Sequence, residues 1–275
     1  MTLPTSLNEI TFGFIGAGNM ASAIVRGLLA AGHDPKKIML SNPTRAKLDQ
    51  LSTELNVQVT QSNQAVCDTA DVLILAVKPQ MMTAALEDLE FTKVHCVISV
   101  AAGLTTSQLS AQVNQMPVIR SMPNTPAIEL QGATGLYADS ATKAAYHPVA
   151  EYLFGAVGEF VWLEKEDQMD IVTAIAGSSP AYFFYFIEGM IEAAKAQGMT
   201  EECAKTLVVQ SALGAATLLK NHPDVDIAER RQQVTSPGGT TAAALTSLQQ
   251  DQLQQIVANA VDAAITRGQE LAANH

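Results

Sequence analysis

The first 163 residues alternate short apolar runs with helical patterns, and this alternation constrains the fold more than any other feature. Runs of strand length occur at 10–15, 38–40, 57–60, 71–77, 95–100, 117–122, 133–138 and 159–163. This alternation is typical of a parallel sheet that is covered by helices. The run 71–77, "DVLILAV", is almost wholly apolar, which predicts a central strand that is buried on both faces.

After residue 164 the strand-like runs disappear. Long Ala-rich helical segments follow, at 166–176, 180–197, 201–220, 226–233 and 240–272. A chain of 275 residues is long enough for two domains. We therefore expect an α/β fold, with a Rossmann-type dinucleotide-binding domain over 1–164 and an all-helical domain over 165–275.

Charge and cysteine content narrow the choice of ligands and of compartment. The net charge of −11, with no clustered Lys or Arg, argues against a nucleic-acid or anionic-membrane surface. No signal peptide and no apolar run of about 20 residues is present, so we expect no membrane segment. The three cysteines, Cys67, Cys96 and Cys203, lie outside any CxxC pattern, which predicts no disulfide framework and no metal site. A cytoplasmic location is expected.

The first predicted strand leads into "GAGNMASA", which has the spacing G-x-G-x-x-A. Gly16 would allow the tight turn, Gly18 a close approach to a diphosphate, and Ala21 close packing of helix on strand. The diphosphate would lie at the helix N-terminus, where free N–H groups favour negative charge. An ordinary Gly-rich turn is the simpler alternative. The position of the motif at the start of a repeated strand and helix pattern favours a dinucleotide site.

The residues after the second predicted strand favour NADPH over NADH. An acidic residue that would bind a ribose hydroxyl is expected about 20 residues after the glycines, and it is missing. The strand ends instead in "LSNPTRAK", where Ser41 and Asn42 can hydrogen-bond a 2′-phosphate while Arg45 and Lys47 supply charge. A solvated cation at a helix start is the alternative for Arg45. NADH remains a second cofactor to consider.

Two later strands end in segments that face the same edge of the predicted sheet. "AVKPQ", residues 76–80, ends the fourth strand at the edge where open α/β sheets bind ligands. Lys78 is placed there to touch ribose or a carboxylate, and a surface loop lysine is the alternative. "SMPNTP", residues 121–126, ends the sixth strand, and its prolines stiffen a loop that can form the floor of the nicotinamide pocket.

None of the five histidines stands in a recognisable catalytic setting, and no Ser/His/Asp order or HExxH motif occurs. A reductase does not need one, because the cofactor carries the hydride and the protein supplies position and electrostatics. A protonated imine accepts hydride readily, so one hydroxyl that donates to its nitrogen can be enough. An imine is therefore the natural substrate for such a site.

A glycine turn, "VTSPGGTT" at 234–241, interrupts the helical half of the chain. Successive N–H groups in such a turn at a helix start can form an anion nest, and Gly238 and Gly239 would give the φ freedom that it requires. The alternative is a plain helix-opening turn that is capped by Thr240 or Thr241.

Taken together, the motifs resemble those of the pyrroline-5-carboxylate reductase family. They are, in order, "GFIGAGNMASA", "LILAVKPQ", "VISVAAG", "RSMPNTPA", "GATGLYA", "AIAGSSPAYFFYFIEGM" and "VTSPGGTT", and they cover about residues 10 to 270. The pairing of "AGSSPAYFF" with "SPGGTT" is more specific than the glycine motif.

The resemblance implies NADPH-dependent reduction of 1-pyrroline-5-carboxylate to L-proline. It also implies a helical domain that interlocks with that of a partner, homodimers that can assemble into decamers, and an active site shared between subunits. The aromatic run 182–186 covers more than one helix face, which suits such a dimer.

The resemblance also assigns site residues. Thr241 would be catalytic, by hydrogen-bonding the ring nitrogen. The substrate would be bound by Ser236, Gly238, Gly239, Thr240 and Thr241. The cofactor would be bound by Gly16, Ala17, Gly18, Asn19, Met20, Ala21, Asn42, Asn63, Ala76, Val77, Lys78 and Pro79, with Arg45 from the charge argument above.

Some points depart from the family or stay open. The segment 221–231 looks longer than the usual family loop, so no role is assigned to it. A β-hydroxyacid dehydrogenase typically has a lysine on the helix that joins the domains, and 168–188 contains none. Reduction of another cyclic imine and a nonenzymatic NADP-binding regulator are the remaining alternatives.

Overall fold

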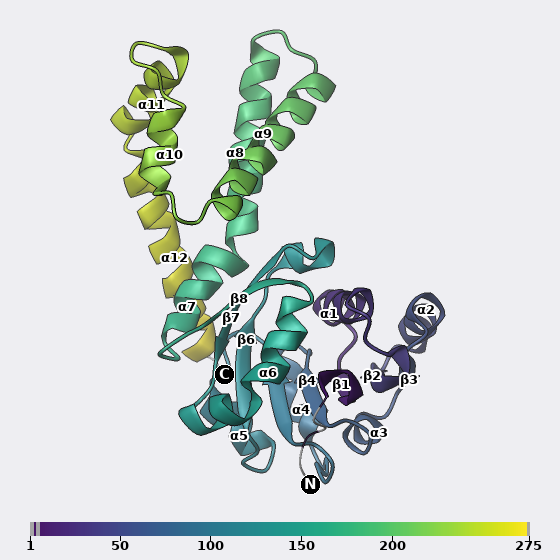
Figure 1. The fold of residues 1–275 in the computed structure, drawn as a ribbon. Coiled ribbons are helices and arrows are strands. Elements are labelled where there is room, and N and C mark those ends of the chain that lie inside the picture. The colour runs from purple at the N-terminus through teal and green to yellow at the C-terminus, as the bar shows by residue number, and fades with distance from the viewer. Residues whose placement is uncertain (1–2, 4–5, 274–275) are drawn as a thin grey trace. The chain divides into compact units, whose positions relative to one another are not determined.

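A computed structural model, which describes residues 3 and 6–273, contains one eight-stranded sheet in the order β3-β2-β1-β4-β5-β6-β7-β8 (Figure 1). The strands are β1 (Phe12–Ile15), β2 (Ile38–Ser41), β3 (Gln58–Thr60), β4 (Val72–Leu75), β5 (Cys96–Ser99), β6 (Val118–Met122), β7 (Gly132–Tyr137) and β8 (Gly158–Trp162). All eight predicted strands are confirmed. Strands β1 to β6 are parallel, whereas β7 runs antiparallel to β6 and β8 is parallel to β7.

The helices of the first part of the chain are α1 (Asn19–Ala30), α2 (Arg45–Leu55), α3 (Asn63–Cys67), α4 (Met82–Leu86), α5 (Thr106–Gln112), α6 (Ser140–Gly155) and α7 (Gln168–Val172). A π-helical turn, Thr173–Gly177, follows α7 directly. The remaining helices are α8 (Ser179–Ala196), α9 (Glu201–Asn221), α10 (Ile227–Gln233), α11 (Thr240–Gln250) and α12 (Leu253–Ala273).

The sheet separates two apolar layers because successive side chains of a strand point to opposite faces. Phe12 and Phe14 pack with α1, α2 and α6 on one face. Ile15 packs with α3, α4 and α5 on the other face. Every residue of β4 is fully buried, which confirms the prediction of a central strand covered on both sides.

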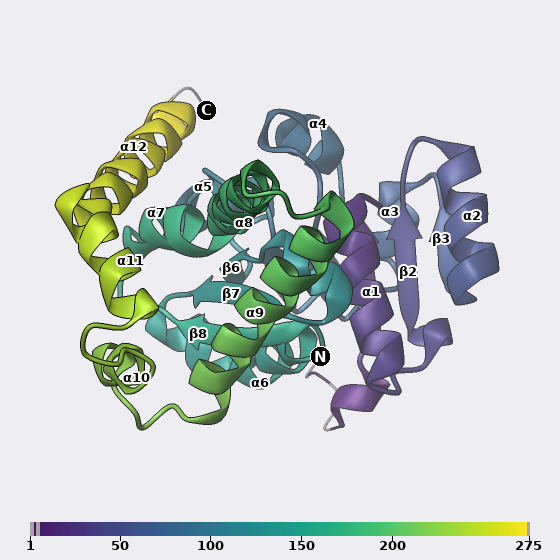
Figure 2. The same cartoon turned by 90° about the horizontal axis from the view of Figure 1, so that it is seen from above.

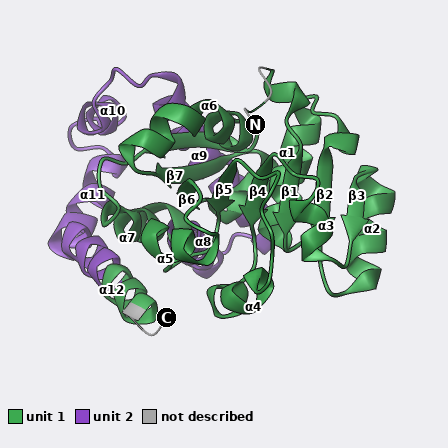
Figure 3. Cartoon of the chain, turned by 90° about the horizontal axis from the view of Figure 1, so that it is seen from below, with its two compact units in different colours: residues 1–178, 264–275 green, residues 179–263 purple. Residues whose placement is uncertain are grey.

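The chain divides into two compact units, residues 1–178 with 264–275 and residues 179–263 (Figure 3). The expected boundary after residue 164 falls inside the first unit, because α7 packs on β7 and Glu166 is tied to the sheet. The Glu166 carboxylate accepts from Thr106 N at 2.6 Å and pairs with Arg120 Nη1 at 3.3 Å. A functional division at 164/165 remains a prediction.

The expected single helix over 240–272 is wrong. It is interrupted between α11 and α12, where Gln252 has a left-handed φ of 53°. Asp251 N donates to Ser247 O to end α11, and Gln252 O accepts from Ile256 N to begin α12. Asp251 in the polar sequence "QQDQ" is a weaker helix former than the Ala and Leu residues on either side, so a break there costs little helix propensity. The segment 166–176 is likewise α-helical only to Val172 and then widens into the π turn.

The second unit buries little of its own apolar surface. Helices α8 and α9 pack on each other (Figure 1 and Figure 2), yet α8, α10 and α11 contain no buried residue and α9 contains one, Ala204. Phe183, Phe184 and Tyr185 are 66%, 66% and 79% exposed. An apolar surface of this kind marks an interaction site. No helix in the described part of the chain is long and apolar enough to cross a bilayer.

Candidate dinucleotide and substrate sites

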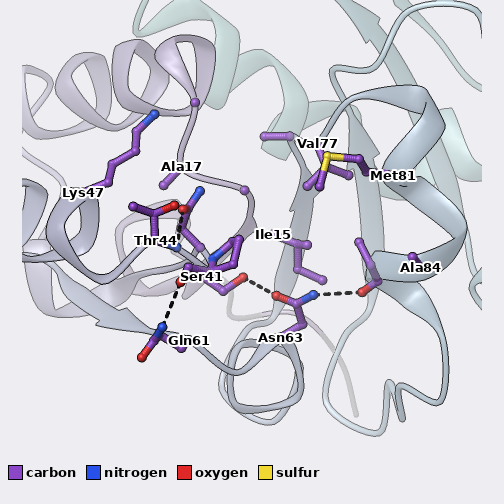
Figure 4. A pocket seen from close by; sticks show the side chains of 16 residues that line it. Ile15, Ala17, Ser41, Thr44, Lys47, Gln61, Asn63, Val77, Met81 and Ala84 are labelled. Carbon is purple, nitrogen blue, oxygen red and sulfur yellow. Dashed lines mark hydrogen bonds between the residues drawn. The ribbon is translucent and has the colours of Figure 1, made fainter.

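A cavity of about 500 Å³ opens at the carboxyl ends of β1, β2 and β4 in the first unit (Figure 4). This is the switch point of the sheet, because the chain passes from β3 at one edge to β4 on the other side of β1. The lining residues are Ile15, Gly16, Ala17, Gly18, Ser41, Asn42, Pro43, Thr44, Lys47, Gln61, Asn63, Ala76, Val77, Met81, Ala84 and Ala85.

The glycine turn has the geometry that a diphosphate requires. Gly16 has a φ of +102°, and a Cβ there would lie 2.5 Å from Ala76 O, so a side chain is excluded. Gly18 is the N-cap of α1, and a Cβ on it would meet no atom within 4 Å. No described side chain caps α1, so its first N–H groups face open space at the cavity. The residues present therefore fit a dinucleotide.

The other members of the motif support this turn from the helix. Ala21 is fully buried, as expected for close packing of α1 on the sheet. Asn19 and Met20 are the first two residues of α1 and lie outside the cavity lining. Their backbone N–H groups lie in the uncapped first turn of α1, and the Asn19 side chain is exposed.

Ser41 lines the cavity as predicted, but its hydroxyl is already engaged within the protein. Its side chain is fully buried, and its Oγ donates to Asn63 Oδ1 at 2.6 Å (Figure 4). Asn63 Nδ2 in turn donates to Ala85 O at 2.9 Å. Asn63 thus lines the cavity while it links β2 to α4. The Asn42 side chain accepts from Thr44 N at 2.9 Å, which shapes the turn into α2.

The two predicted cations differ in position. Lys47 lines the cavity and is half-buried, whereas Arg45 lies outside the lining and its Nε donates to Asp49 at 2.8 Å. Figure 4 shows Lys47 on the same side of the cavity as Thr44 and Ala17, with Val77 and Met81 opposite. Among the described residues, Lys47 is the charged side chain that this lining contains.

Only part of the segment after β4 lines the cavity. Ala76 and Val77 line the cavity, while Lys78 is exposed and Pro79 opens a short 3₁₀ turn outside the lining. The sequence reasoning missed Thr44, Gln61, Met81 and Ala84 as lining residues. Thr44 could have been identified from the sequence, because it is a hydroxyl residue in the segment "LSNPTRAK" that follows the second predicted strand.

The glycine loop of the second unit opens α11. Gly238 has a φ of +70°, as predicted, but Gly239 is extended at φ −80° and does not use its conformational freedom. The Gly239 N–H donates to Ser236 O at 3.0 Å within the loop, and the first bond of the helix runs from Ala243 N to Gly239 O. Gly239 is the N-cap and no side chain caps the helix, so the alternative in which Thr240 or Thr241 serves as the cap is excluded.

The two threonines that follow the loop, Thr240 and Thr241, are exposed, as is Ser236. The N–H groups of the first turn of α11 precede the first helical hydrogen bond, so they are the donors that an anion would meet.

The titratable groups that burial perturbs lie away from these sites. Burial raises the pKa of the Cys67 thiol to about 12 and that of Cys96 further, so both stay protonated. Burial lowers the pKa of His33, whose Nδ1 lies 3.1 Å from Tyr152 Oη. None of the three lines the cavity. The described residues contain no group of three His, Cys, Asp or Glu that could hold a metal ion.

Comparison with known proteins matches both halves of the chain. Residues 11–103 match the family model of NADP oxidoreductase, coenzyme F420-dependent, and residues 166–271 match that of pyrroline-5-carboxylate reductase dimerisation. The chain is 43% identical to pyrroline-5-carboxylate reductase of Pasteurella multocida, over 94% of this chain and 96% of the relative. It is 42% identical to that of Pseudomonas aeruginosa at the same coverage.

Comparison with solved structures points to the same family. A pyrroline-5-carboxylate reductase from Coxiella burnetii superposes with a TM-score of 0.88 at 37% identity, over 95% of this chain and 98% of that chain. The pyrroline carboxylate reductase of Plasmodium falciparum with NADP bound superposes at 0.84 with 27% identity, over 97% of this chain and 100% of that chain. The chain therefore belongs to the pyrroline-5-carboxylate reductase family.

Proposed function

We propose that this protein reduces 1-pyrroline-5-carboxylate to L-proline with NADPH, the last step of proline biosynthesis. The observation that carries the proposal is the match to pyrroline-5-carboxylate reductases over 94% of the chain. The two family models also span both the glycine turn at the cavity and the loop that opens α11.

The cavity of the first unit would hold the cofactor. The turn Gly16–Gly18 and the start of α1 would bind the diphosphate, and Asn63, Ala76 and Val77 would line the nucleotide. Asn42, Thr44 and Lys47 would surround the 2′-phosphate, with Lys47 supplying the charge because it lines the cavity. Arg45 would contribute only by leaving its contact with Asp49. When bound, NADPH supplies the hydride.

The loop at the start of α11 would hold the substrate. The free N–H groups of its first turn can donate to a carboxylate and hold it without a cation, which suits a chain of net charge −11. Ser236, Gly238, Gly239 and Thr240 would shape this site. The Thr241 hydroxyl would donate to the lone pair of the ring nitrogen, which polarises the C=N bond, stabilises the charge that develops on nitrogen as hydride adds, and orients the imine carbon toward the hydride donor.

The assembly would be a homodimer, with each active site formed by residues of both chains. The support is the match of 166–271 to a dimerisation domain and the exposed apolar faces of α8 and α9. A decamer of five dimers and a cytoplasmic location complete the proposal.

An assay of the purified protein tests the reaction. We expect 1-pyrroline-5-carboxylate to cause oxidation of NADPH and formation of proline, with NADH less effective. The absence of proline with both cofactors would refute the proposed reaction. Faster turnover of a six-membered cyclic imine would reassign the substrate within the same class. Cofactor binding without turnover of any imine would indicate a nonenzymatic NADP-binding regulator instead.

A substitution of Thr241 tests its role. Thr241→Ala should lower kcat about 100-fold, because a proton donor to the reacting group contributes roughly this factor, and it should leave NADPH affinity unchanged. Thr246→Ala is the matched control, since Thr246 lies on the same helix and its Oγ1 donates to Ala242 O at 2.9 Å. Weaker NADPH binding in Thr241→Ala with kcat intact would contradict the assignment.

A further inference from the structure

Asn124 lies just beyond the end of β6, at the carboxyl edge of the parallel strands. The cavity occupies the β1–β2–β4 part of this edge. A dinucleotide crosses the switch point between β1 and β4, so its second half extends toward β5 and β6. If the proposed function holds, Asn124 therefore lies on the nicotinamide side of the site.

Both ends of the Asn124 side chain are engaged, and the residue is 7% exposed. Its Oδ1 accepts from Ala133 N at 2.8 Å, and its Nδ2 donates to Ala176 O at 3.0 Å. These partners determine the orientation of the amide, because a backbone N–H can meet only the oxygen and a carbonyl only the NH₂ group. Asn124 thus joins the start of β7 to the π turn after α7.

The π turn is the segment that needs this donor. Ser178 N donates to Thr173 O at 2.8 Å, a bond that spans five residues. In an α-helical register, Ala176 O would accept from the N–H of residue 180. That residue is Pro180, which has no N–H. The Asn124 amide thus supplies to Ala176 O the donor that proline lacks.

Packing holds the same turn against the sheet. A Cβ on Gly177 would lie 2.8 Å from Met122 Cε, so the turn approaches the last residue of β6 as closely as a glycine permits. The π turn therefore rests on the carboxyl edge of β6 through one apolar contact and one amide hydrogen bond. Widened turns of this kind are frequent at functional sites.

We propose that Asn124 is a positioning residue for the reduction. By donating to Ala176 O it keeps the chain in the π register and holds the backbone of Gly177 and Ser178 at the nicotinamide end of the cofactor site. Loss of this hydrogen bond lets the turn move, which impairs the orientation of the hydride donor toward the substrate. It leaves the nucleotide cavity at the other end of the site intact.

Asn124→Asp isolates this bond, because the aspartate keeps the size of the side chain and the acceptor for Ala133 N but loses the donor. We expect kcat to fall at least tenfold while the KM for NADPH changes less than twofold. Pro180→Ala added to this variant gives Ala176 O an α-helical donor at residue 180, which favours the α register over the π register, so it should not restore kcat. A kcat within twofold of wild type in Asn124→Asp, or recovery of wild-type kcat in the double variant, overturns the proposal.

Asp139→Ala is the control for a general loss of stability. Asp139 caps α6, with its Oδ1 accepting from Thr142 N at 2.9 Å. It follows β7, which runs antiparallel to β6, so it lies at the opposite edge of the sheet. Asp139→Ala should lower the Tm while kcat stays at the wild-type value. A fall of kcat equal to that of Asn124→Asp at the same loss of Tm contradicts a specific positioning role.

Amide hydrogen exchange separates this proposal from the proposed function. Ser178 N–H should exchange at least tenfold faster in Asn124→Asp than in the wild type, whether or not the protein forms proline. Equal protection of Ser178 in the two proteins overturns the positioning role. A wild-type protein that forms no proline refutes the proposed function alone.

Discussion

Individual side chains at the cavity differ in whether they are free to meet a ligand. Ser41 is committed to Asn63, and Asn63 is committed to Ser41 and Ala85. Lys47 makes no hydrogen bond or ion pair with the described residues, although it lines the cavity. From sequence position alone, Arg45 and Lys47 were both expected to supply charge to the 2′-phosphate, because they lie two residues apart in one motif. The structure separates them through burial and through the Asp49 partner of Arg45.

Lys47→Met should raise the KM for NADPH about tenfold and leave that for NADH unchanged. The reason is the loss of a charge-assisted hydrogen bond to the 2′-phosphate, which contributes about 1.5–3 kcal/mol. The measurement is steady-state kinetics with each cofactor. Arg45→Met should have a smaller effect, and Lys37→Met, at an exposed ion pair with Glu9, should have none. A larger effect of Arg45→Met than of Lys47→Met would place the phosphate at Arg45.

Among the structural elements, the helices that begin at the proposed anion sites differ from most other helices in how their N-termini are capped. Helices α3, α5, α6, α9 and α10 are capped by the side chains of Ser62, Thr105, Asp139, Thr200 and Asp226. Helices α1 and α11 instead begin after an extended glycine, Gly18 or Gly239, with no side-chain cap. Both proposed anion sites thus have helix N–H groups that no side chain occupies. Helix α2 also begins after an extended residue without a side-chain cap, Thr44, which lines the cavity. The short α4 and α7 lack caps as well, but their N-cap residues are already helical.

Gly238→Ala should raise the KM for the substrate and leave NADPH affinity unchanged. A Cβ at Gly238 meets no atom within 4 Å, so the cost is the strain of a left-handed φ of +70°, about 1–2 kcal/mol. Relief of that strain would move the N–H groups of the loop. Gly32→Ala is the matched control, because Gly32 also has a positive φ, +89°, with open space around it and lies outside both sites. An equal change of KM in both variants would remove the loop from substrate binding.

Taken as a whole, the molecule has one unit with a complete core and one without. The first unit buries two continuous apolar layers. The helices of the second unit bury almost nothing, and their exposed residues are aromatic and aliphatic. Such a surface is stable in water only when another surface covers it. The dimerisation match over 166–271 identifies this unit as the site of association.

Phe184→Asp should dissociate the proposed dimer and abolish turnover, because it would place a charge in the proposed apolar interface and separate the two chains that the proposal assigns to each site. Phe184 is 66% exposed in the single chain. The measurement is mass by light scattering, with activity at the same concentration. Val161→Asp, at a residue 59% exposed on β8, is the control and should keep the wild-type mass. A Phe184→Asp protein of wild-type mass and activity would contradict this interface.

Much of the fold was predictable because it depends on local sequence patterns, such as apolar runs and the spacing of glycines. Each strand of the sheet is an apolar run that the sequence alone identifies, and Gly16 and Gly18 are readable from their spacing. The break at Asp251 and Gln252 was not, because a helical pattern on both sides conceals a single left-handed residue. The engagement of the Ser41 hydroxyl was not predictable either, since it depends on a hydrogen bond to Asn63, which lies 22 residues away.

The sequence by itself determined the order of strands and helices, the glycine turns that suit anions, and membership of a reductase family, because these depend on residue type and spacing. Tertiary structure decided which polar groups remain free. Lys47 rather than Arg45 lines the cavity, and the Asn124 amide donates to Ala176 O in the π turn. These outcomes depend on contacts between segments far apart in the chain, and no local pattern of residues encodes such contacts.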